Sequence, residues 1–194
     1  MGSTVAVTGA AQQVASVSEA LRNAGAEVIA VDDLEALGAA VAGLAPGSLD
    51  CYVQLPVHVA PRGNAVVDRV RNFLEDGLLA RFTAASTLLP ALSDDGRVVL
   101  VGGNTPGEAS APDDQSARVA LLDVLAHAIQ ADTATTQIKI RRLPNTESAE
   151  QIATVALGGE PTREEALADL QAREPKMSFD DMRIEVMGLV NGQF

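Results

Sequence analysis

Residues 4–33, TVAVTGAAQQVASVSEALRNAGAEVIAVDD, decide the fold. The run Thr4–Thr8 is short, β-branched and followed by Gly9, which is typical of a buried parallel strand that ends in a turn. Apolar residues then recur at helical spacing, at Val14, Val17 and Leu21. Gly25 stands where helices commonly end in a left-handed residue, and Glu27–Val31 predicts a second strand. The segment therefore predicts a strand–helix–strand unit.

The same alternation continues along the chain. Leu34, Leu37, Val41 and Leu44 form one apolar helical face. Further strands are predicted at Asp50–Gln54, Arg97–Val101, Gln137–Leu143 and Arg183–Val190, and further helices at 64–92, 114–131, Ser148–Leu157 and Thr162–Ala172. Together they predict a single Rossmann-like α/β domain over residues 1–194, with a doubly wound parallel sheet. Residues 159–194 are expected to form either a final strand or an interface extension.

Composition narrows the classes of function. The chain has 194 residues, a formal net charge of −12, no Trp and one Tyr. So acidic a protein repels phosphate backbones and anionic lipids, which argues against nucleic-acid and membrane-surface roles. The lone Cys51 lies in a predicted buried strand and is expected to be a core residue, consistent with a reducing cytoplasm. The sequence shows neither a signal peptide nor a membrane span, so a cytoplasmic location is expected.

Parallel sheets bind ligands beyond the carboxyl ends of their strands, here near 8–13, Asp32, 54–56 and 102–104. Asp32 stands where Rossmann proteins place the acid that binds ribose hydroxyls, although a helix-capping acid beside Asp33 is the simpler interpretation. The turn Gly102–Gly103–Asn104 could receive a small anion or simply form a tight turn. His58 and His127 have no further ligand at metal-binding spacing, so no metal site is predicted.

The order of these pieces resembles the short-chain dehydrogenase/reductase (SDR) superfamily over roughly residues 4–157. The opening segment resembles that family's first strand, phosphate turn, helix and second strand. GLLARFTAASTLLPAL (77–92) and DDGRVVLVGG (94–103) resemble its long interface helix and central strand. DDQSARVALLDVLAHAIQAD (113–132) resembles the helix that carries the active-site Tyr and Lys. The resemblance implies a Rossmann fold, an NAD or NADP cofactor and an Asn-Ser-Tyr-Lys catalytic set.

The cofactor cradle departs from the family pattern. The family's turn reads Thr-Gly-x-x-x-Gly-x-Gly because the backbone must approach a pyrophosphate closely. Here Gly9 remains, whereas the later glycine positions hold Gln13 and Ala15. The family's Asn-Asn-Ala-Gly segment corresponds to residues 54–57, Gln-Leu-Pro-Val. Thr8, Gly9 and Asp32 are therefore only vestigial cofactor-binding candidates.

The catalytic set is also replaced. By position, the family's Asn, Ser, Tyr and Lys correspond to Gly77, Gly103, Asp114 and Arg118, with Gly102 as the alternative Ser position after a one-residue slip. The Tyr-Lys pair works because the ammonium lowers the pKa of the phenol, and nothing here reproduces that chemistry. Asp114 and Arg118 are expected to form a surface ion pair, with a new general base at Asp114 as the alternative. The substrate-covering loop is reduced to Pro144–Thr146, and a strand and helix are missing around Ala45–Leu49.

These departures predict a pseudoenzyme: a non-catalytic, structural or regulatory SDR-like subunit without a cofactor. It is expected to homodimerise or to pair with an active SDR paralogue through helices 64–92 and 114–131, which form the usual dimer interface in the family. One alternative is a small-molecule binding or sensing module with a remodelled pocket. Another is an NAD- or NADP-dependent oxidoreductase with an atypical site.

Overall fold

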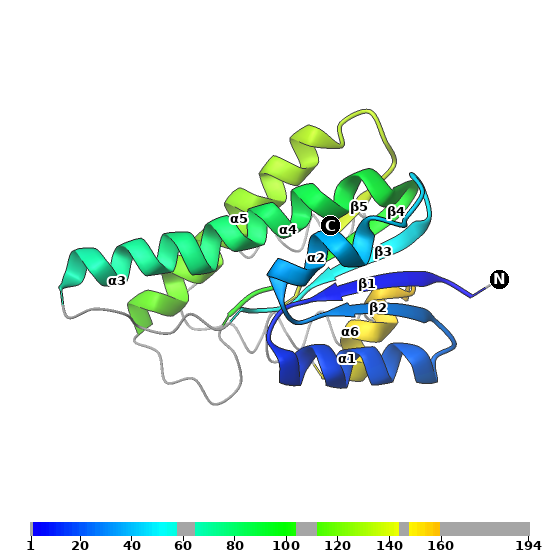
Figure 1. The fold of residues 1–194 in the computed structure, drawn as a ribbon, viewed down its shortest axis with the longest axis horizontal. Helices are drawn as coiled ribbons and strands as arrows, with labels where there is room; N and C mark the ends of the chain where they lie inside the picture. Colours follow the sequence, from blue (N-terminus) through cyan, green and yellow to red (C-terminus); the bar gives the residue numbers. More distant parts are fainter. Residues whose placement is uncertain (1, 58–64, 104–111, 144–147, 160–194) are drawn as a thin grey trace, which may run out of the picture. The chain divides into compact units, whose positions relative to one another are not determined.

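The computed structural model describes residues 2–57, 65–103, 112–143 and 148–159, and strands alternate with helices along them (Figure 1). The strands are β1 (Thr4–Thr8), β2 (Glu27–Val31), β3 (Leu49–Gln54), β4 (Leu92–Val101) and β5 (Lys139–Leu143). The helices are α1 (Ala11–Asn23), α2 (Leu34–Val41), α3 (Val66–Asn72), α4 (Ala80–Leu88), α5 (Pro112–Asp132) and α6 (Ala149–Ala156). A π-helical segment, η1 (Phe73–Leu79), joins α3 to α4, and a 3-10 turn, η2 (Leu89–Ala91), follows α4.

The chain divides into two compact units, Met1–Leu157 and Gly158–Phe194, and the first contains every described strand and helix. The helix predicted at Thr162–Ala172, the strand predicted at Arg183–Val190 and the loop Pro144–Thr146 lie outside the described residues. What residues 159–194 form therefore stays a prediction.

The five strands form one parallel sheet in the order β2-β1-β3-β4-β5. The chain leaves β1 on one side to form β2 and returns on the other side as β3, so the topological switch point lies between β1 and β3. The predicted doubly wound parallel sheet is confirmed. The predicted strand at 137–143 is β5, which forms an edge of this sheet.

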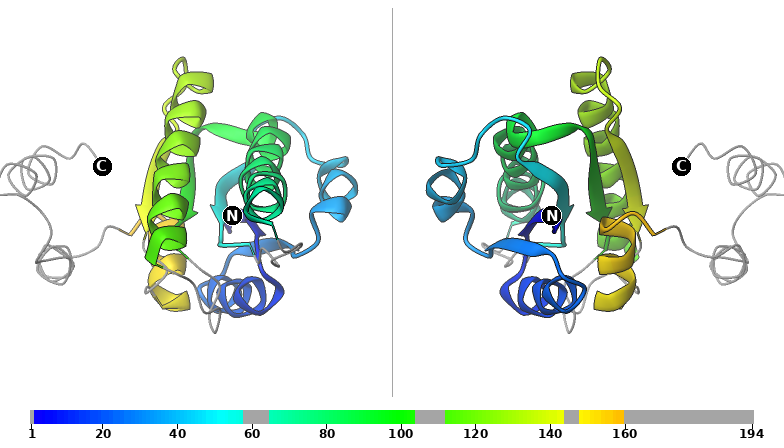
Figure 2. Two further views of the ribbon diagram at one scale, coloured as in Figure 1. Left: turned by 90° about the vertical axis from the view of Figure 1, so that its left-hand side faces the viewer. Right: turned by 90° about the vertical axis from the view of Figure 1, so that its right-hand side faces the viewer.

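Side-chain alternation divides the core between the two faces of the sheet. Val5, Val7, Cys51 and Val53 pack with α1 and α6, and we call this side the α1/α6 face. Ala6, Tyr52, Val98 and Leu100 pack with α2, α4 and α5, and we call this side the α4/α5 face. The views along the molecule show the same division (Figure 2). Cys51 is fully buried, as predicted.

The helix predicted over 64–92 is a continuous helical stretch, but its hydrogen bonding changes in the middle. In the π-helical segment η1 the backbone bonds lengthen to i→i+5, and the N–H of Ala80 donates to the carbonyl of Glu75. Gly77, at the position of the family's Asn, lies in this segment. Pro90 lies in the 3-10 turn that ends the stretch, because proline has no N–H to donate to the helix.

Local signals set most boundaries. Gly25 follows α1 with a φ of +89°, and a capping box between Ser148 and Gln151 opens α6. β4 begins at Leu92, earlier than the predicted Arg97, because buried Leu92 pairs with Leu49 before the register shifts. The cap of α2 is Asp33, whose side chain accepts from the N–H of Glu35. The expectation that Asp32 caps this helix was therefore wrong by one residue.

Candidate functional site

The β1–α1 turn, where the family resemblance places the pyrophosphate, packs tightly against the segment that follows β3. Gly9 has a φ of +141°, and a Cβ at this position would lie 2.6 Å from the Cβ of Leu55. The N–H of Leu55 donates to the carbonyl of Thr8 (2.8 Å), and that of Ala10 donates to the carbonyl of Pro56 (3.0 Å). A glycine is therefore required at position 9, because a side chain there would collide with Leu55, which is fully buried.

The same turn offers little that fits a dinucleotide. The N–H of Ala10 is already used, α1 has no side-chain cap, and Ala15 replaces a glycine with an exposed side chain. Gln13 is partly buried, and its Oε1 is a buried acceptor without a hydrogen bond. The residues of this turn do not fit a pyrophosphate in the family's manner.

A chain of buried polar groups crosses the α4/α5 face near the carboxyl ends of β1 and β3. The hydroxyls of Thr8 and Tyr52 share a hydrogen bond of 2.9 Å. Gln54 donates through Nε2 to the Tyr52 hydroxyl and to the carbonyl of Arg81, both at 2.8 Å. Arg81 donates in turn through Nε to Gln54 Oε1 (2.8 Å) and through Nη2 to the carbonyl of Val101 (3.0 Å). This network holds the Arg81 guanidinium between α4 and the ends of β3 and β4.

Burial shapes the protonation of two members of this network. Burial raises the pKa of Tyr52 to about 12, although its hydrogen bonds to Thr8 and Gln54 oppose the shift. The phenol therefore stays neutral near pH 7 and cannot act as a tyrosinate. Burial lowers the pKa of Arg81 to about 10, and the nearby cation of Arg118 lowers it further. Arg81 still carries its charge near neutral pH.

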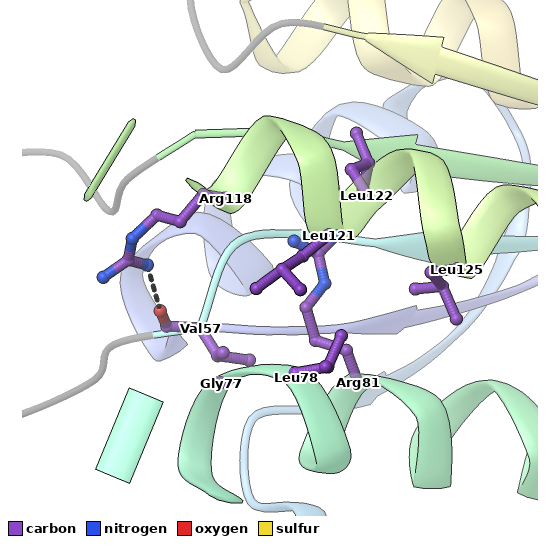
Figure 3. Close-up of a pocket in the computed structure, with 8 residues that line it drawn as sticks. All are labelled: Val57, Gly77, Leu78, Arg81, Arg118, Leu121, Leu122 and Leu125. Atoms are coloured by element: carbon purple, nitrogen blue, oxygen red, sulfur yellow. Dashed lines mark hydrogen bonds between the residues drawn. The ribbon is translucent and has the colours of Figure 1, made fainter. Parts of the chain in front are cut away.

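A small pocket, with room for about one water molecule, lies beside Arg81 between the helical stretch η1–α4 and α5 (Figure 3). Its lining is Val57, Gly77, Leu78, Arg81, Arg118, Leu121, Leu122 and Leu125. Arg118 donates through Nη1 to the carbonyl of Val57 at 3.4 Å, and the residue makes a further interaction besides this one. The pocket is thus an apolar cleft with two guanidinium groups in its wall.

The structure brings together two of the four positions at which the family carries its catalytic set, Gly77 and Arg118, in this one pocket. Gly103 is buried just after β4, with a φ of +97°. Asp114 lies on α5, but its side chain is outside the described residues, so the predicted ion pair with Arg118 stays a prediction. Asp32 is exposed after β2.

Sequence reasoning missed Arg81. One signal could have found it: Gln54 closes an otherwise apolar strand and, once buried, requires polar partners. Arg81 is the charged residue in the apolar run LLARFTAASTLL (78–89) and is a natural partner. Periodicity alone could not show that α4 brings Arg81 to the end of β3.

No metal site emerges from the part of the chain that the structure describes, where no three His, Cys, Asp or Glu residues cluster. His127 is exposed on α5, with its Nδ1 2.7 Å from the carbonyl oxygen of Asp123. His58 lies outside the described residues. Within the same described ranges, no helix has the length and apolar character needed to cross a membrane.

A second candidate surface lies on the long helices. Four large apolar side chains of the described residues are exposed, and all four lie on the helical stretch or on α5: Val67 (66%), Leu74 (45%), Leu79 (61%) and Val124 (55%). A π-helix joins residues five apart by hydrogen bonds, which places Leu74 and Leu79 one turn apart on one side of η1. The change in helical pitch therefore gathers exposed apolar surface on this helix.

Comparison with known proteins identifies the fold. No family model matches the sequence, and no curated protein matches it. Among solved structures, a doubly substituted short-chain dehydrogenase/reductase of Serratia marcescens aligns with a TM-score of 0.59 at 20% identity, over 82% of this chain and 90% of that chain. The protein lin1944 of Listeria innocua aligns with a TM-score of 0.59 at 13% identity, over 83% and 96%. A small-chain dehydrogenase aligns with a TM-score of 0.56 at 14% identity, over 82% and 91%. The chain therefore has the Rossmann-like fold of these proteins.

Proposed function

We propose that this chain is a non-catalytic, SDR-like subunit with a structural or regulatory role. It associates, either with a second copy or with an active SDR paralogue, through the stretch α3–η1–α4 and through α5. The observation that carries the proposal is the concentration of exposed large apolar side chains on these helices. Large apolar side chains that are exposed together on a protein surface commonly mark an interaction site.

The chemistry of the pocket supports the absence of catalysis. Hydride transfer to a carbonyl needs a proton donor whose pKa lies near the working pH. Gly77 and Gly103 carry no such group, and Arg118 presents a guanidinium where the family has a lysine. Tyr52 is the sole tyrosine, and its phenol is buried and has its pKa raised to about 12. The family's proton relay has no counterpart among these groups.

The closed β1–α1 turn supports the absence of an NAD or NADP cofactor. Leu55 and Pro56 occupy the contacts of Gly9 and Ala10, where a pyrophosphate would need to approach the backbone. Titration calorimetry of the full chain with each nucleotide is expected to give a flat trace. Measurable affinity for either nucleotide would instead favour the atypical oxidoreductase.

Association is tested by sedimentation velocity of the full chain from low to high micromolar concentration. Replacing Val67 and Leu79 together by Lys places two charges in the exposed apolar surface and is expected to shift the species toward monomer by at least tenfold in concentration. Ala15→Lys, on the exposed side of α1, is the matched control and should leave the distribution unchanged. Co-expression with an intact SDR from the same source distinguishes the hetero-oligomer. A wild-type monomer at high micromolar concentration that captures no such SDR would refute the proposal.

The pocket between η1–α4 and α5 favours a second candidate, a small-molecule binding or sensing module. Its lining combines apolar side chains with two arginines, the mixture of residue types found in ligand sites. The two candidates are compatible, because the exposed apolar side chains and the pocket-lining residues are different residues.

A further inference from the structure

We propose that Arg81 is a positioning residue for the association surface. Its three hydrogen bonds to Gln54 and Val101, which we call the Arg81 clamp, hold the η1 segment in its π-helical register. That register aligns exposed Leu74 with exposed Leu79 on one side of the helix. The inference rests on the proposed association, and it names the buried contact that sets the shape of that surface.

The clamp ties both the backbone and the side chain of one helical residue to the sheet. Gln54 donates through Nε2 to the carbonyl of Arg81, and Arg81 donates back through Nε to Gln54 Oε1, both at 2.8 Å. Arg81 also donates through Nη2 to the carbonyl of Val101 at 3.0 Å, at the end of β4. Because hydrogen bonds are directional, these contacts fix the rotation of the helix about its own axis at Arg81.

The η1 segment is the part of the helical stretch whose bonding is most easily changed. Its hydrogen bonds run i→i+5, and the N–H of Ala80 donates to the carbonyl of Glu75. Such π-helical bonding is rare in proteins. Gly77 lies within the segment, and glycine is less favourable than alanine inside a helix. Without a constraint from outside the helix, we expect the segment to relax to ordinary i→i+4 bonding.

Relaxation to i→i+4 bonding would change the association surface. In an α-helix, residues five apart lie about 140° apart around the axis, because 3.6 residues make one turn. Leu74 would therefore leave the side of the helix on which Leu79 lies. The same change turns Arg81 relative to α3 and away from Gln54, which is fully buried and would lose the donor to its Oε1. The clamp therefore opposes the relaxation.

The test uses the full chain and a double variant, Gln54→Leu with Arg81→Met, which replaces both partners of the clamp by apolar side chains of similar size. Sedimentation velocity measures the dissociation constant of the association. The NMR scalar coupling across the hydrogen bond from the Ala80 N–H to the Glu75 carbonyl measures the register. The double variant is expected to lose this coupling and to raise the dissociation constant at least tenfold, while its circular dichroism spectrum stays like that of the wild type.

Two single variants separate positioning from loss of stability. Val17→Ala removes buried volume from the α1/α6 face, so it should lower the melting temperature yet keep the coupling and the dissociation constant of the wild type. Arg81→Lys keeps a cation but lacks the fork of donors that reaches two partners, so it should weaken association less than the double variant does. It also keeps the test decisive if the double variant does not fold.

Three results would each overturn the inference: a wild type without the Ala80–Glu75 coupling, a folded clamp variant that retains it, or a folded clamp variant with an unchanged dissociation constant. A wild type that stays monomeric and captures no SDR would refute the proposed association instead. The coupling would then still report whether the clamp holds the register, so the two failures are distinguishable.

Discussion

The two faces of the sheet differ in what they bury. On the α1/α6 face the buried side chains are apolar apart from Ser18, and the closed β1–α1 turn joins this core through Leu55. On the α4/α5 face the same strands bury Thr8, Tyr52 and Gln54, which connect to Arg81 and the pocket. Buried polar groups need hydrogen-bond partners, and on this face each of these side chains has one. The α1/α6 face is therefore almost wholly apolar, whereas the α4/α5 face carries a connected network of buried hydrogen bonds.

The largest expected effect tests whether packing has closed the cofactor turn. Gly9→Ala introduces a Cβ 2.6 Å from that of Leu55 and forces an L residue to a φ of +141°. Backbone strain and overpacking together should lower the free energy of unfolding by about 2–5 kcal/mol. Urea denaturation measures this change.

Gly38→Ala in α2 is the matched control for the same chemical change. A Cβ at Gly38 meets nothing within 4 Å, and the residue lies inside a helix. Alanine should therefore stabilise the protein by about 0.5–1 kcal/mol. Equal effects of the two substitutions would show that Gly9 is not held by its contact with Leu55, and the interpretation of the closed turn would fail.

The next prediction concerns how stability depends on pH through one buried titrating group on each face of the sheet. Burial raises the pKa of Cys51, on the α1/α6 face, from 9.0 to about 12, and that of Tyr52, on the α4/α5 face, from 10.0 to about 12. In the unfolded chain each group loses its proton near its ordinary pKa, whereas the folded protein retains it. The unfolded state therefore binds fewer protons, and stability falls as pH rises above 9, first because of Cys51.

Between pH 9 and 10 the Cys51 contribution amounts to a loss of about 1 kcal/mol, and it continues as pH rises toward 12. Cys51→Ala should remove the loss between pH 9 and 10, whereas Tyr52→Phe should leave it and reduce the loss above pH 10. Denaturant midpoints across this range for the three proteins provide the measurement. A wild-type curve that is flat from pH 9 to 10 would contradict the burial of Cys51.

Much of the fold could be predicted because its signals are local. Strong β-branched runs marked β1 and β2, and Gly25 marked the end of α1. The start of β4 was missed because Ser93–Gly96 has the composition of a turn, and its place in the strand depends on the pairing of distant Leu49 with Leu92. The π-helical segment was also missed, because a change from i→i+4 to i→i+5 bonding leaves little trace in a pattern of apolar residues.

The site was predicted less completely for a similar reason. Comparison with the family motifs directed attention to Gly77 and Arg118, which do share a pocket. Arg81 belongs to no family motif, and its position follows only from the hydrogen bonds that Gln54 and Val101 supply across the sheet. A residue whose role depends on three elements distant in sequence cannot be found from spacing along one of them.

The smallest expected effect compares the caps of one helix on each face. Ser148 and Gln151 form a reciprocal capping box at α6, with bonds of 2.9 and 3.2 Å, whereas Asp33 makes one bond of 2.9 Å at α2. Ser148→Ala should lower the free energy of unfolding by about 1 kcal/mol, and Asp33→Ala by about the same or less. Salt screens the charge of Asp33 beside the helix dipole, whereas the Ser148 capping box is neutral. For helices equally coupled to the core, high salt should therefore reduce the loss caused by Asp33→Ala and leave the loss caused by Ser148→Ala unchanged. The difference between the two losses should widen. A larger loss for Asp33→Ala at high salt would show that α2, and with it the α4/α5 face, contributes more to stability than its buried polar groups suggest.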